Sequence, residues 1–528
     1  MPETEPTAPT PQKRRLFPAI LLSALLMTLA FPAPDLGCLA WIGLAPLCWA
    51  LSQARRPRHA FALGYLFGIA HWGTTIYWIG TTVSAWTHSA AGWIAWILLT
   101  LIKSLWFALF GVLVWWIGKR FRADESARFI ARPLAIASAW TLVEWLRCQS
   151  SVAMPWSLSG YTQYRYLPVI QAADLAGVFI ITFALGWMGA ALAEVIQSYI
   201  DSKRTERTNR NTSFRPVFPP LLLLGLMLVY GAFALHRSYE GQSMRLALIQ
   251  PNIASRRGDP YALERDLAMY RSLAGRIQPG SVDLVVWPES TVSEYLREPS
   301  SQETFADFAN RLQAYQLLGS SYMDSKEQVY NSAMLVAPSG GVERYDKNWL
   351  VPMGEWVVMR PLLQPFDSVF HFPPDTVPGR QDSIMQAGKA KMSVLICYES
   401  VFPIVSRTRS RLGANLLVGI TNDSWAGESS ELQQHVAMAA LRAVENRRWL
   451  ASSATTGITG LISPTGHIDA LQPYKEDVYT GTVQLRTEVT IYARFGDWLV
   501  ALCAMVVAWA LFGGKRGRAA ESVSDGKL

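Results

Sequence analysis

The sequence predicts a polytopic α-helical membrane bundle of about eight spans joined to an α/β sandwich domain. Half of the residues are apolar and only 17% are charged, a balance that is poor in charge for a soluble protein. The long apolar runs lie within roughly the first 236 residues and in a short C-terminal stretch. The residues between them alternate short β-rich runs with amphipathic helical patterns. This composition excludes disordered, collagen-like and disulfide-rich chains.

Eight mostly apolar stretches reach the length of about 17 to 25 residues with which a helix crosses a bilayer. They cover residues 16–33, 36–53, 60–80, 91–117, 129–147, 172–197, 217–236 and 496–513. The chain therefore divides into a disordered cytoplasmic tail at 1–15, seven spans within 16–236, an outer domain at 237–490, an eighth span at 496–513 and a second cytoplasmic tail at 514–528.

Lysine and arginine residues gather in every second connector, which indicates how the spans are oriented. Basic clusters lie before the first span and after the second, fourth, sixth and eighth, whereas the connectors at 32–37 and 81–92 contain none. The positive-inside rule then predicts that both termini are cytoplasmic and that residues 237–490 lie across the membrane. The connectors also account for the net charge of +8. No nucleic-acid-binding motif accompanies that charge, so no nucleic-acid partner is expected.

In the outer domain, polar side chains follow three continuous apolar runs. DLVVW is followed by PES at 288–290, SVLI by CYE at 397–399, and LLVGI by TNDSW at 421–425. Continuous apolar runs are typical of strands covered on both faces, and sites commonly gather at the carboxyl ends of such strands. The sequence therefore predicts one shared pocket that contains a carboxylate, a thiol and an amide–acid pair.

Cys397 is the one cysteine of the outer domain and the candidate nucleophile. A thiol needs a base to become a thiolate, and Glu289 can take that role where an apolar setting raises its pKa. Lys347 is the candidate cation for charge that develops on an attacked carbonyl oxygen. Each also has an ordinary structural interpretation: an inert buried cysteine, a carboxylate at a helix N-terminus and a lysine in a solvated turn. By pattern, neither His371 nor His435 is placed to act as the base, and no metal or cofactor is expected.

The segments VVWPES, KNWLVPMGE and LICYES resemble the Glu-Lys-Cys signature of the carbon–nitrogen hydrolase (nitrilase) superfamily. Four further segments, together with the eight spans, resemble the integral-membrane branch of this superfamily, the bacterial apolipoprotein N-acyltransferases. They are EWLR at 144–147, MPWSLSGYTQ at 154–163, TNDSWAG at 421–427 and TTGITGLISPTG at 455–466. The resemblance implies a stacked α-β-β-α domain in the periplasm, close to the membrane. It also implies that Glu289 is the general base, Lys347 stabilises the tetrahedral intermediate and Cys397 carries the acyl group.

The resemblance assigns further residues around this triad. Glu355 and Glu399 match acidic residues that support the site, and Tyr398 matches a neighbouring functional tyrosine. Residues expected to contact lipid or substrate are Trp156, Trp356, Phe366 and Trp425.

An apolar, proline-rich loop separates Lys347 from Cys397 and contains Trp356 and Phe366. We expect it to dip into the membrane interface or to act as a lid, rather than to be a buried structural excursion.

Two positions depart from the family pattern. Arg256 and Arg257 stand where a Lys-Trp pair often follows the first strand, and Trp349 stands where the family often has a histidine.

The activity that the resemblance implies is a two-step acyl transfer at the bacterial inner membrane without a cofactor. Cys397 would take an acyl chain from a phospholipid, expected to be phosphatidylethanolamine, and pass it to the N-terminal diacylglyceryl-cysteine of an apolipoprotein. The same triad with water as second nucleophile would instead make a membrane-tethered amidase or nitrilase. A transporter or scaffold with an inactive outer domain is the alternative from a different class.

Overall fold

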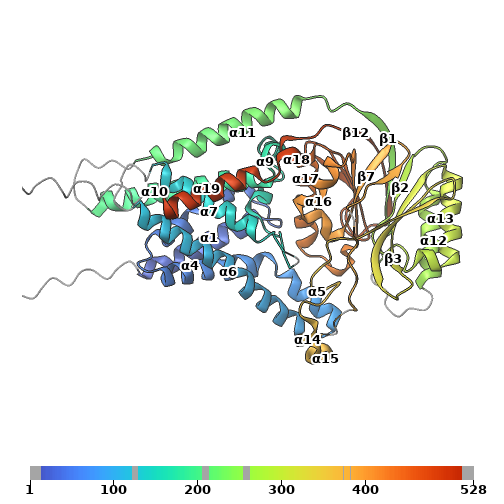
Figure 1. Ribbon diagram of the computed structural model, residues 1–528, viewed down its shortest axis with the longest axis horizontal. Helices are drawn as coiled ribbons and strands as arrows, with labels where there is room; N and C mark the ends of the chain where they lie inside the picture. The colour runs from blue at the N-terminus through green and yellow to red at the C-terminus, as the bar shows by residue number, and fades with distance from the viewer. Residues whose placement is uncertain are drawn as a thin grey trace, which may run out of the picture.

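The computed structural model describes residues 13–513, except for 122–128, 151, 205–212, 254–261, 371, 373 and 381. Apolar helices form one half of the molecule, and two packed β-sheets with flanking helices form the other (Figure 1). The C-terminal tail and most of the N-terminal one lie outside the described residues, as do Arg256, Arg257 and His371.

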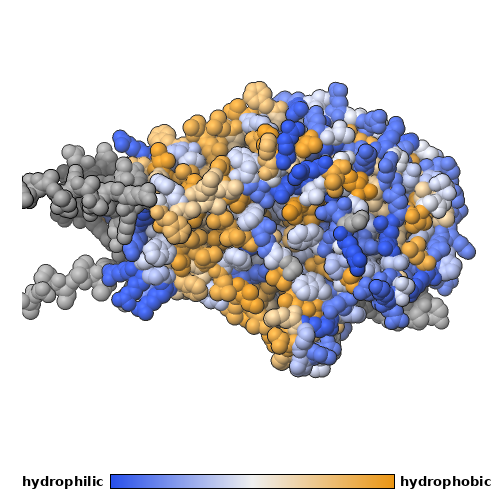
Figure 2. All heavy atoms as spheres, in the orientation of Figure 1, coloured by the Kyte–Doolittle hydropathy of each residue, from blue (hydrophilic) through white to orange (hydrophobic). Residues whose placement is uncertain are grey.

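Each of the eight predicted spans corresponds to a helical segment in the half of the molecule that consists of apolar helices. They are α1 (Lys13–Ala30), η1 to α3 (Gly37–Leu39, Ala40–Gly43 and Ala45–Ser52), α4 (Pro57–Thr75), α6 (Ala91–Arg120), α7 (Ala131–Leu146), α10 (Val178–Arg204), α11 (Phe218–His236) and α19 (Trp498–Phe512). In the described part of the chain, α6, α10 and α11 are the three that are long and apolar enough to cross a membrane by length and composition. Apolar side chains cover much of this half's visible surface (Figure 2).

The third and sixth expected spans are not single continuous helices. The third expected span reaches residue 80, but α4 ends at Thr75 and the chain turns into α5 (Trp78–Thr87). The Thr75 hydroxyl donates to the carbonyl of His71, a local bond of the kind that bends helices. The sixth expected span is divided at Gly177, whose φ of 69° separates α9 (Ala173–Ala176) from α10. A Cβ there would lie 2.6 Å from the Tyr492 ring, so glycine is required by both space and backbone conformation.

The other half of the molecule, the sandwich domain, contains two six-stranded mixed sheets. The first has the order β12-β1-β2-β3-β4-β5 and the second the order β11-β10-β9-β8-β7-β6. In the first sheet β1, β2 and β3 run parallel, and in the second β7, β8 and β9 do. The strands are β1 (Gln242–Gln250), β2 (Leu284–Val286), β3 (Tyr315–Met323), β4 (Val329–Val336), β5 (Val342–Asp346), β6 (Met385–Ala387), β7 (Ala390–Ile396), β8 (Leu416–Thr421), β9 (Leu450–Ala454), β10 (Gly460–Ile462), β11 (Ile468–Ala470) and β12 (Asp477–Leu485).

The two sheets pack face to face, with a pair of helices on each outer side. Leu248 and Val286 of the first sheet meet Val394 and Val418 of the second in one apolar cluster. The helices α12 (Ala262–Gly275) and α13 (Pro299–Leu312) cover the outer face of the first sheet, and α16 (Pro403–Arg411) and α17 (Glu431–Asn446) lie on the second (Figure 1). The strands expected from continuous apolar runs are thus buried on both faces, as predicted.

The outer face of α17 is buried against the helical bundle. Phe31 and Trp156 from the bundle side share an apolar cluster with Phe402 and Met438 of the sandwich domain. Polar contacts cross the same boundary: the backbone N–H of Val178 donates to Glu445, and Arg447 pairs with Asp174 at 2.9 Å. The bundle and the sandwich are therefore packed together through the helix layer nearest the second sheet.

A glycine on β3 allows the segment after β2 to approach closely. A Cβ at Gly319 would lie 2.5 Å from the Cα of Glu289 and 2.6 Å from the backbone nitrogen of Ser290. Because these are backbone atoms, they have to move, and overpacking of this kind costs about 1–3 kcal/mol. We expect Gly319→Ala to lower the Tm of the purified protein by several degrees. Gly275→Ala is the control, since no atom lies within 4 Å of its Cβ position. Equal Tm values for the two variants would contradict this account.

Candidate active site

The structure brings Glu289, Lys347 and Glu355 into one buried cluster. Glu289 follows β2 and Lys347 follows β5 directly. The Lys347 Nζ lies 2.9 Å from Glu355 Oε1 and 3.5 Å from Glu289 Oε1, and only 1% of the lysine side chain is exposed. Asn331 on β4 donates from its amide to both carboxylates, at 2.8 Å to Glu289 and 2.7 Å to Glu355. The sequence offered no signal for Asn331, because its role depends on the pairing of β4 with β5.

The segment after β8 completes the hydrogen bonding of Glu289. The backbone N–H of Asn422 donates to Glu289 Oε2 at 2.9 Å, while Oε1 faces Asn331 and Lys347. Both carboxylate oxygens are thereby fixed in direction. Residues that follow β2, β5 and β8 are thus in direct contact.

Cys397 begins the short helix η7 (Cys397–Val401) immediately after β7, in a backbone conformation with φ of 48°. L residues rarely adopt this left-handed region, so the surrounding contacts have to hold it. Glu399 is one such contact. Its Oε2 accepts from the backbone of Ile396, and its Oε1 accepts from the Tyr345 hydroxyl and the backbone of Asn348. Glu399 therefore joins the turn at Cys397 to the segment that contains Lys347.

Burial and charge set the protonation of the cluster. Burial raises the pKa of the Cys397 thiol well above its usual value, Glu289 raises it further and Lys347 opposes both. Burial also raises the pKa of Glu289, with a further rise from Glu355 that Lys347 and the hydrogen bonds partly offset. Burial would lower the pKa of Lys347, but Glu355 and Glu289 more than compensate and the net shift is upward. The resting site thus holds a neutral thiol beside a permanent cation and a carboxylate of raised pKa, which suits general-base activation.

Tyr398 and Trp156 lie where the sandwich meets the bundle. The Tyr398 hydroxyl donates to the carbonyl of Ala153 at 2.7 Å. The Trp156 indole donates to Gln434 on α17 at 2.6 Å and is 3% exposed. The ring of Trp78 lies 5.3 Å from that of Trp156 and 5.7 Å from that of Trp425. Trp156 and Trp425 thus belong to one aromatic group at this boundary.

The loop between Lys347 and β6 carries the other two expected lipid contacts. It contains the short helices α14 (Arg360–Leu363), η6 (Gln364–Phe366) and α15 (Asp367–Phe370), which lie at the edge of the molecule (Figure 1). Phe366 is 52% exposed, Leu362 67% and Met359 63%, whereas Trp356 is partly buried. The segment 359–366 thus presents apolar side chains to its surroundings, whereas Leu350 and Val357, nearer to Lys347, are buried.

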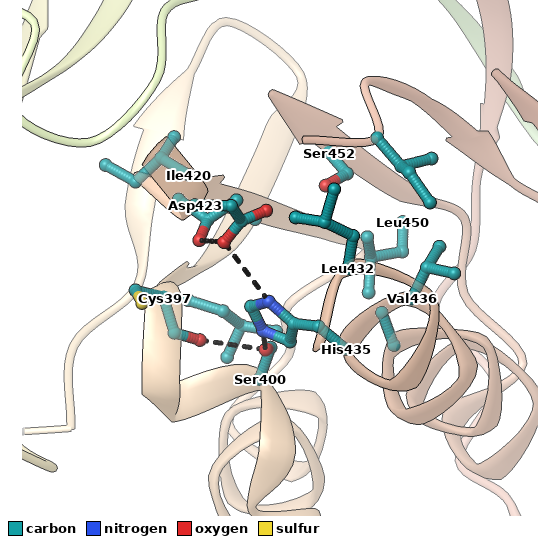
Figure 3. Close-up of a pocket in the computed structure, with 14 residues that line it drawn as sticks. Cys397, Ser400, Ile420, Asp423, Leu432, His435, Val436, Leu450 and Ser452 are labelled. Carbon is teal, nitrogen blue, oxygen red and sulfur yellow. Dashed lines mark hydrogen bonds and ion pairs between the residues drawn. The ribbon is translucent and has the colours of Figure 1, made fainter. Parts of the chain in front are cut away.

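One histidine, His435, lines the same cavity as Cys397. This small cavity is lined by Cys397, Ser400, Asp423 and His435 together with apolar side chains of β8 and α17 (Figure 3). His435 contacts Ser400 and Asp423. The sequence pattern carried no signal for a histidine in this cavity. The position of His435 depends on how α17 docks over β8, which a helical pattern alone does not reveal.

The same neighbourhood contains the group of described residues whose spacing could hold an ion. Ligand atoms of Asp423, Glu431 and His435 lie within 4.8 Å of one another, and all three residues are buried. Two carboxylates around one imidazole nitrogen can share either a proton or a cation.

Comparison with known proteins assigns both halves of the chain. Residues 23–191 match the model of the apolipoprotein N-acyltransferase N-terminal domain, and residues 245–491 match that of the carbon–nitrogen hydrolases. The chain is 36% identical over 513 residues to an apolipoprotein N-acyltransferase of Geobacter metallireducens, covering 94% of this chain and 96% of that one. It is 30% identical over 510 residues to the enzyme of that name from Pseudomonas putida, with the same coverage.

The sandwich is accordingly nitrilase-like, with Glu289, Lys347 and Cys397 gathered at its strand ends beside an apolar helical bundle. Because the similarity extends over both halves, the chain belongs to the apolipoprotein N-acyltransferase family.

Proposed function

We propose that this apolipoprotein N-acyltransferase moves an acyl chain from phosphatidylethanolamine to the N-terminal diacylglyceryl-cysteine of lipoproteins through a thioester on Cys397. The observation that carries the mechanism is the buried contact of Lys347 with Glu289 and Glu355. A fixed cation and a carboxylate of raised pKa, in the electrostatic surroundings of a neutral thiol, support the proposed roles. An intact site of this kind favours an enzyme over a scaffold that only binds lipoproteins.

In the first half-reaction, Glu289 takes the proton of Cys397 and the thiolate attacks the ester carbonyl of the phospholipid. Lys347 stabilises the oxyanion of the tetrahedral intermediate. The carbon–oxygen bond then breaks, and the leaving alkoxide takes the proton from Glu289 and departs as a lysophospholipid. In the second half, the α-amine attacks the thioester, the carbon–sulfur bond breaks, and the amine proton returns through Glu289 to the thiolate. The products are the N-acylated lipoprotein and the free thiol.

Glu355, Glu399 and Tyr398 hold the reacting groups in this scheme. Glu355 fixes the ammonium of Lys347, and Glu399 connects the turn at Cys397 to the Lys347 segment. Tyr398 anchors the same turn to the bundle.

We further propose an inner-membrane protein with both termini cytoplasmic and its sandwich domain, residues 237–490, in the periplasm. The support is the distribution of charge along the helices. Arg55, Arg56 and Arg58 lie at the beginning of α4, and Lys119 and Arg120 in the last turn of α6. Basic residues at these helix ends favour the cytoplasmic side.

The direct test is the intact mass of the purified enzyme after incubation with phosphatidylethanolamine. We expect the wild type to gain the mass of one acyl chain, which hydroxylamine removes, and Cys397→Ala to gain none. Adducts on both forms, or on neither, would contradict the proposed nucleophile or donor. A diacylglyceryl-cysteine peptide should then discharge the adduct and itself gain the acyl mass.

The pH dependence of acyl-enzyme formation tests the role of Glu289. Because its pKa is raised and the base must be ionised, the rate constant should increase as pH rises through a range above that of an ordinary glutamate. Asn331→Ala removes a hydrogen bond that lowers this pKa, so the increase should move to still higher pH, with a several-fold loss at pH 6. Asn310→Ala, an exposed site on α13, is the control. An unchanged profile in Asn331→Ala would argue against Glu289 as the base.

The exposed loop of α14, η6 and α15 is proposed to insert into the membrane interface near the site. Removing one buried leucine from such a contact costs about 1.5 kcal/mol or more. We therefore expect Leu362→Ser to reduce acyl transfer from phospholipid vesicles roughly tenfold while the Tm is unchanged. Leu296→Ser is the control, because that exposed leucine lies in η5 (Tyr295–Arg297) next to α13, at the end of the sandwich remote from the bundle. Equal rates for both variants would contradict interfacial insertion.

A further inference from the structure

Three contacts connect Asp423 to the backbone of Cys397 through His435 and Ser400 (Figure 3). His435 Nδ1 lies 3.5 Å from Asp423 Oδ1, and His435 Nε2 lies 2.6 Å from Ser400 Oγ. Ser400 Oγ in turn donates to the carbonyl oxygen of Cys397 at 2.8 Å. We refer to Asp423, His435 and Ser400 as the relay. All three are buried.

The directions of these bonds determine where the protons lie. Ser400 has one hydroxyl proton and gives it to the Cys397 carbonyl, so its contact with His435 requires that Nε2 be the donor. The other ring nitrogen faces the carboxyl groups of Asp423 and Glu431, at 3.5 and 3.7 Å. The Asp423 carboxylate can only accept, so its pairing with the ring puts a proton on Nδ1 as well. Protons on both nitrogens make the ring an imidazolium.

We propose that His435, as an imidazolium paired with Asp423, is a positioning residue that fixes the turn of Cys397 through Ser400. This inference rests on the proposed function, in which Cys397 is the nucleophile. The left-handed φ of 48° at Cys397 needs support from outside the turn. Glu399 accepts a hydrogen bond from the backbone N–H of Ile396, just before Cys397. Ser400 of the relay donates to the carbonyl oxygen of Cys397 itself.

The imidazolium also has an electrostatic consequence. The carboxylate of Asp423 raises the pKa of the Cys397 thiol and so opposes the thiolate. A positive ring beside Asp423 offsets that opposition. Loss of the ring charge would leave a buried carboxylate next to the nucleophile without its cation, and the thiolate would be harder to form.

The surroundings keep this ring charged over the working pH range. Burial lowers the pKa of His435, but Asp423 and Glu431 more than compensate and raise it to about 9. The pKa of Glu431 is itself raised to about 8 by burial and by Asp423, with His435 opposing. Ionisation of Glu431 adds negative charge and favours the imidazolium, so the loss of the ring's charge is expected near pH 9.

The groups that face the ring come from four parts of the fold. Asp423 belongs to η8 (Asp423–Trp425), Glu431 to α17 itself, and Cys397 and Ser400 to η7. The fourth part is the segment that follows α7, which contributes the uncharged indole of Trp156, whose ring centroid lies 6.0 Å from that of His435.

The test is the rate constant of acyl-enzyme formation from phosphatidylethanolamine between about pH 6 and 10. For the wild type, it should fall as pH rises through about 9, where the ring loses its charge. His435→Gln should be about tenfold slower at pH 7, in the range expected for a lost hydrogen bond to a charged group, and should lack this fall. Ser410→Ala should match the wild type, because this buried hydroxyl on α16 has no hydrogen-bond partner among the described residues.

Ser400→Ala provides a second variant that leaves the pair of His435 and Asp423 in place. It should slow acyl-enzyme formation about as much as His435→Gln, since it removes the connection to the Cys397 carbonyl. It also tests the relay if His435→Gln does not fold. Wild-type rates and profiles in Ser400→Ala would overturn the proposal, as would variants whose Tm falls while the profile stays unchanged.

Two further measurements distinguish a failure of the relay from a failure of the nucleophile and from metal binding at His435. An acyl adduct on Cys397→Ala would show that the proposed function has failed, whereas no adduct on Cys397→Ala with normal relay variants would overturn the relay alone. Incubation of the wild type with EDTA should leave the rate unchanged. A loss that Zn²⁺ restores would overturn the proposal, because His435 Nδ1 would then be a metal ligand and not a proton donor.

Discussion

Gln434 on α17 binds the helical bundle to the sandwich domain, and the position of the active site depends on this contact. Its Oε1 accepts from the indoles of Trp78 and Trp156, at 3.2 and 2.6 Å, and its amide donates to the carbonyls of Pro32 and Thr75, each at 3.1 Å. These groups are buried, so separating the two halves would leave several of them without partners. Because the next residue, His435, lines the same cavity as Cys397, the same turn of α17 reaches both the bundle and the candidate active site.

The chemistry of the site follows from placing charges where little water reaches them. A buried ammonium is stable only if it is paired, which explains why Lys347 contacts two carboxylates and why Asn331 donates to both. The same burial keeps the Cys397 thiol neutral until a base removes its proton. Excluding water strengthens these interactions, and it would also protect the proposed thioester until an amine arrives.

The sequence predicted the elements better than their ends. Apolar length identified a helical segment for each expected span, and continuous apolar runs identified the strands that end at Glu289 and Cys397. Hydropathy did not predict where helices end or break, because local effects decide this. Examples are the Thr75 hydroxyl at the end of α4 and the positive φ of Gly177. Whether all eight segments cross the membrane stays a prediction, because by length and composition three of the described helices meet the criterion.

Within the site, residues next to strand ends were predictable and residues from other elements were not. The spacing of polar residues after apolar runs pointed to the carboxylate and the thiol, and the resemblance supplied their roles. Asn331, Gln434 and His435 contact the site through the pairing of β4 with β5 or the docking of α17, and these are long-range events. A side chain whose partner is far away in the chain carries no local sequence signal.

The fate of the acyl-enzyme distinguishes an acyltransferase from a hydrolase, because the two reactions differ only in the second nucleophile. The thioester would be formed from phosphatidylethanolamine, freed of excess lipid, and followed by intact mass in buffer with and without a diacylglyceryl-cysteine peptide. We expect the adduct to persist in buffer and to disappear with the peptide, which gains an equal amount of acyl chain. Release of free fatty acid in buffer as fast as transfer to the peptide would instead identify a membrane-tethered hydrolase.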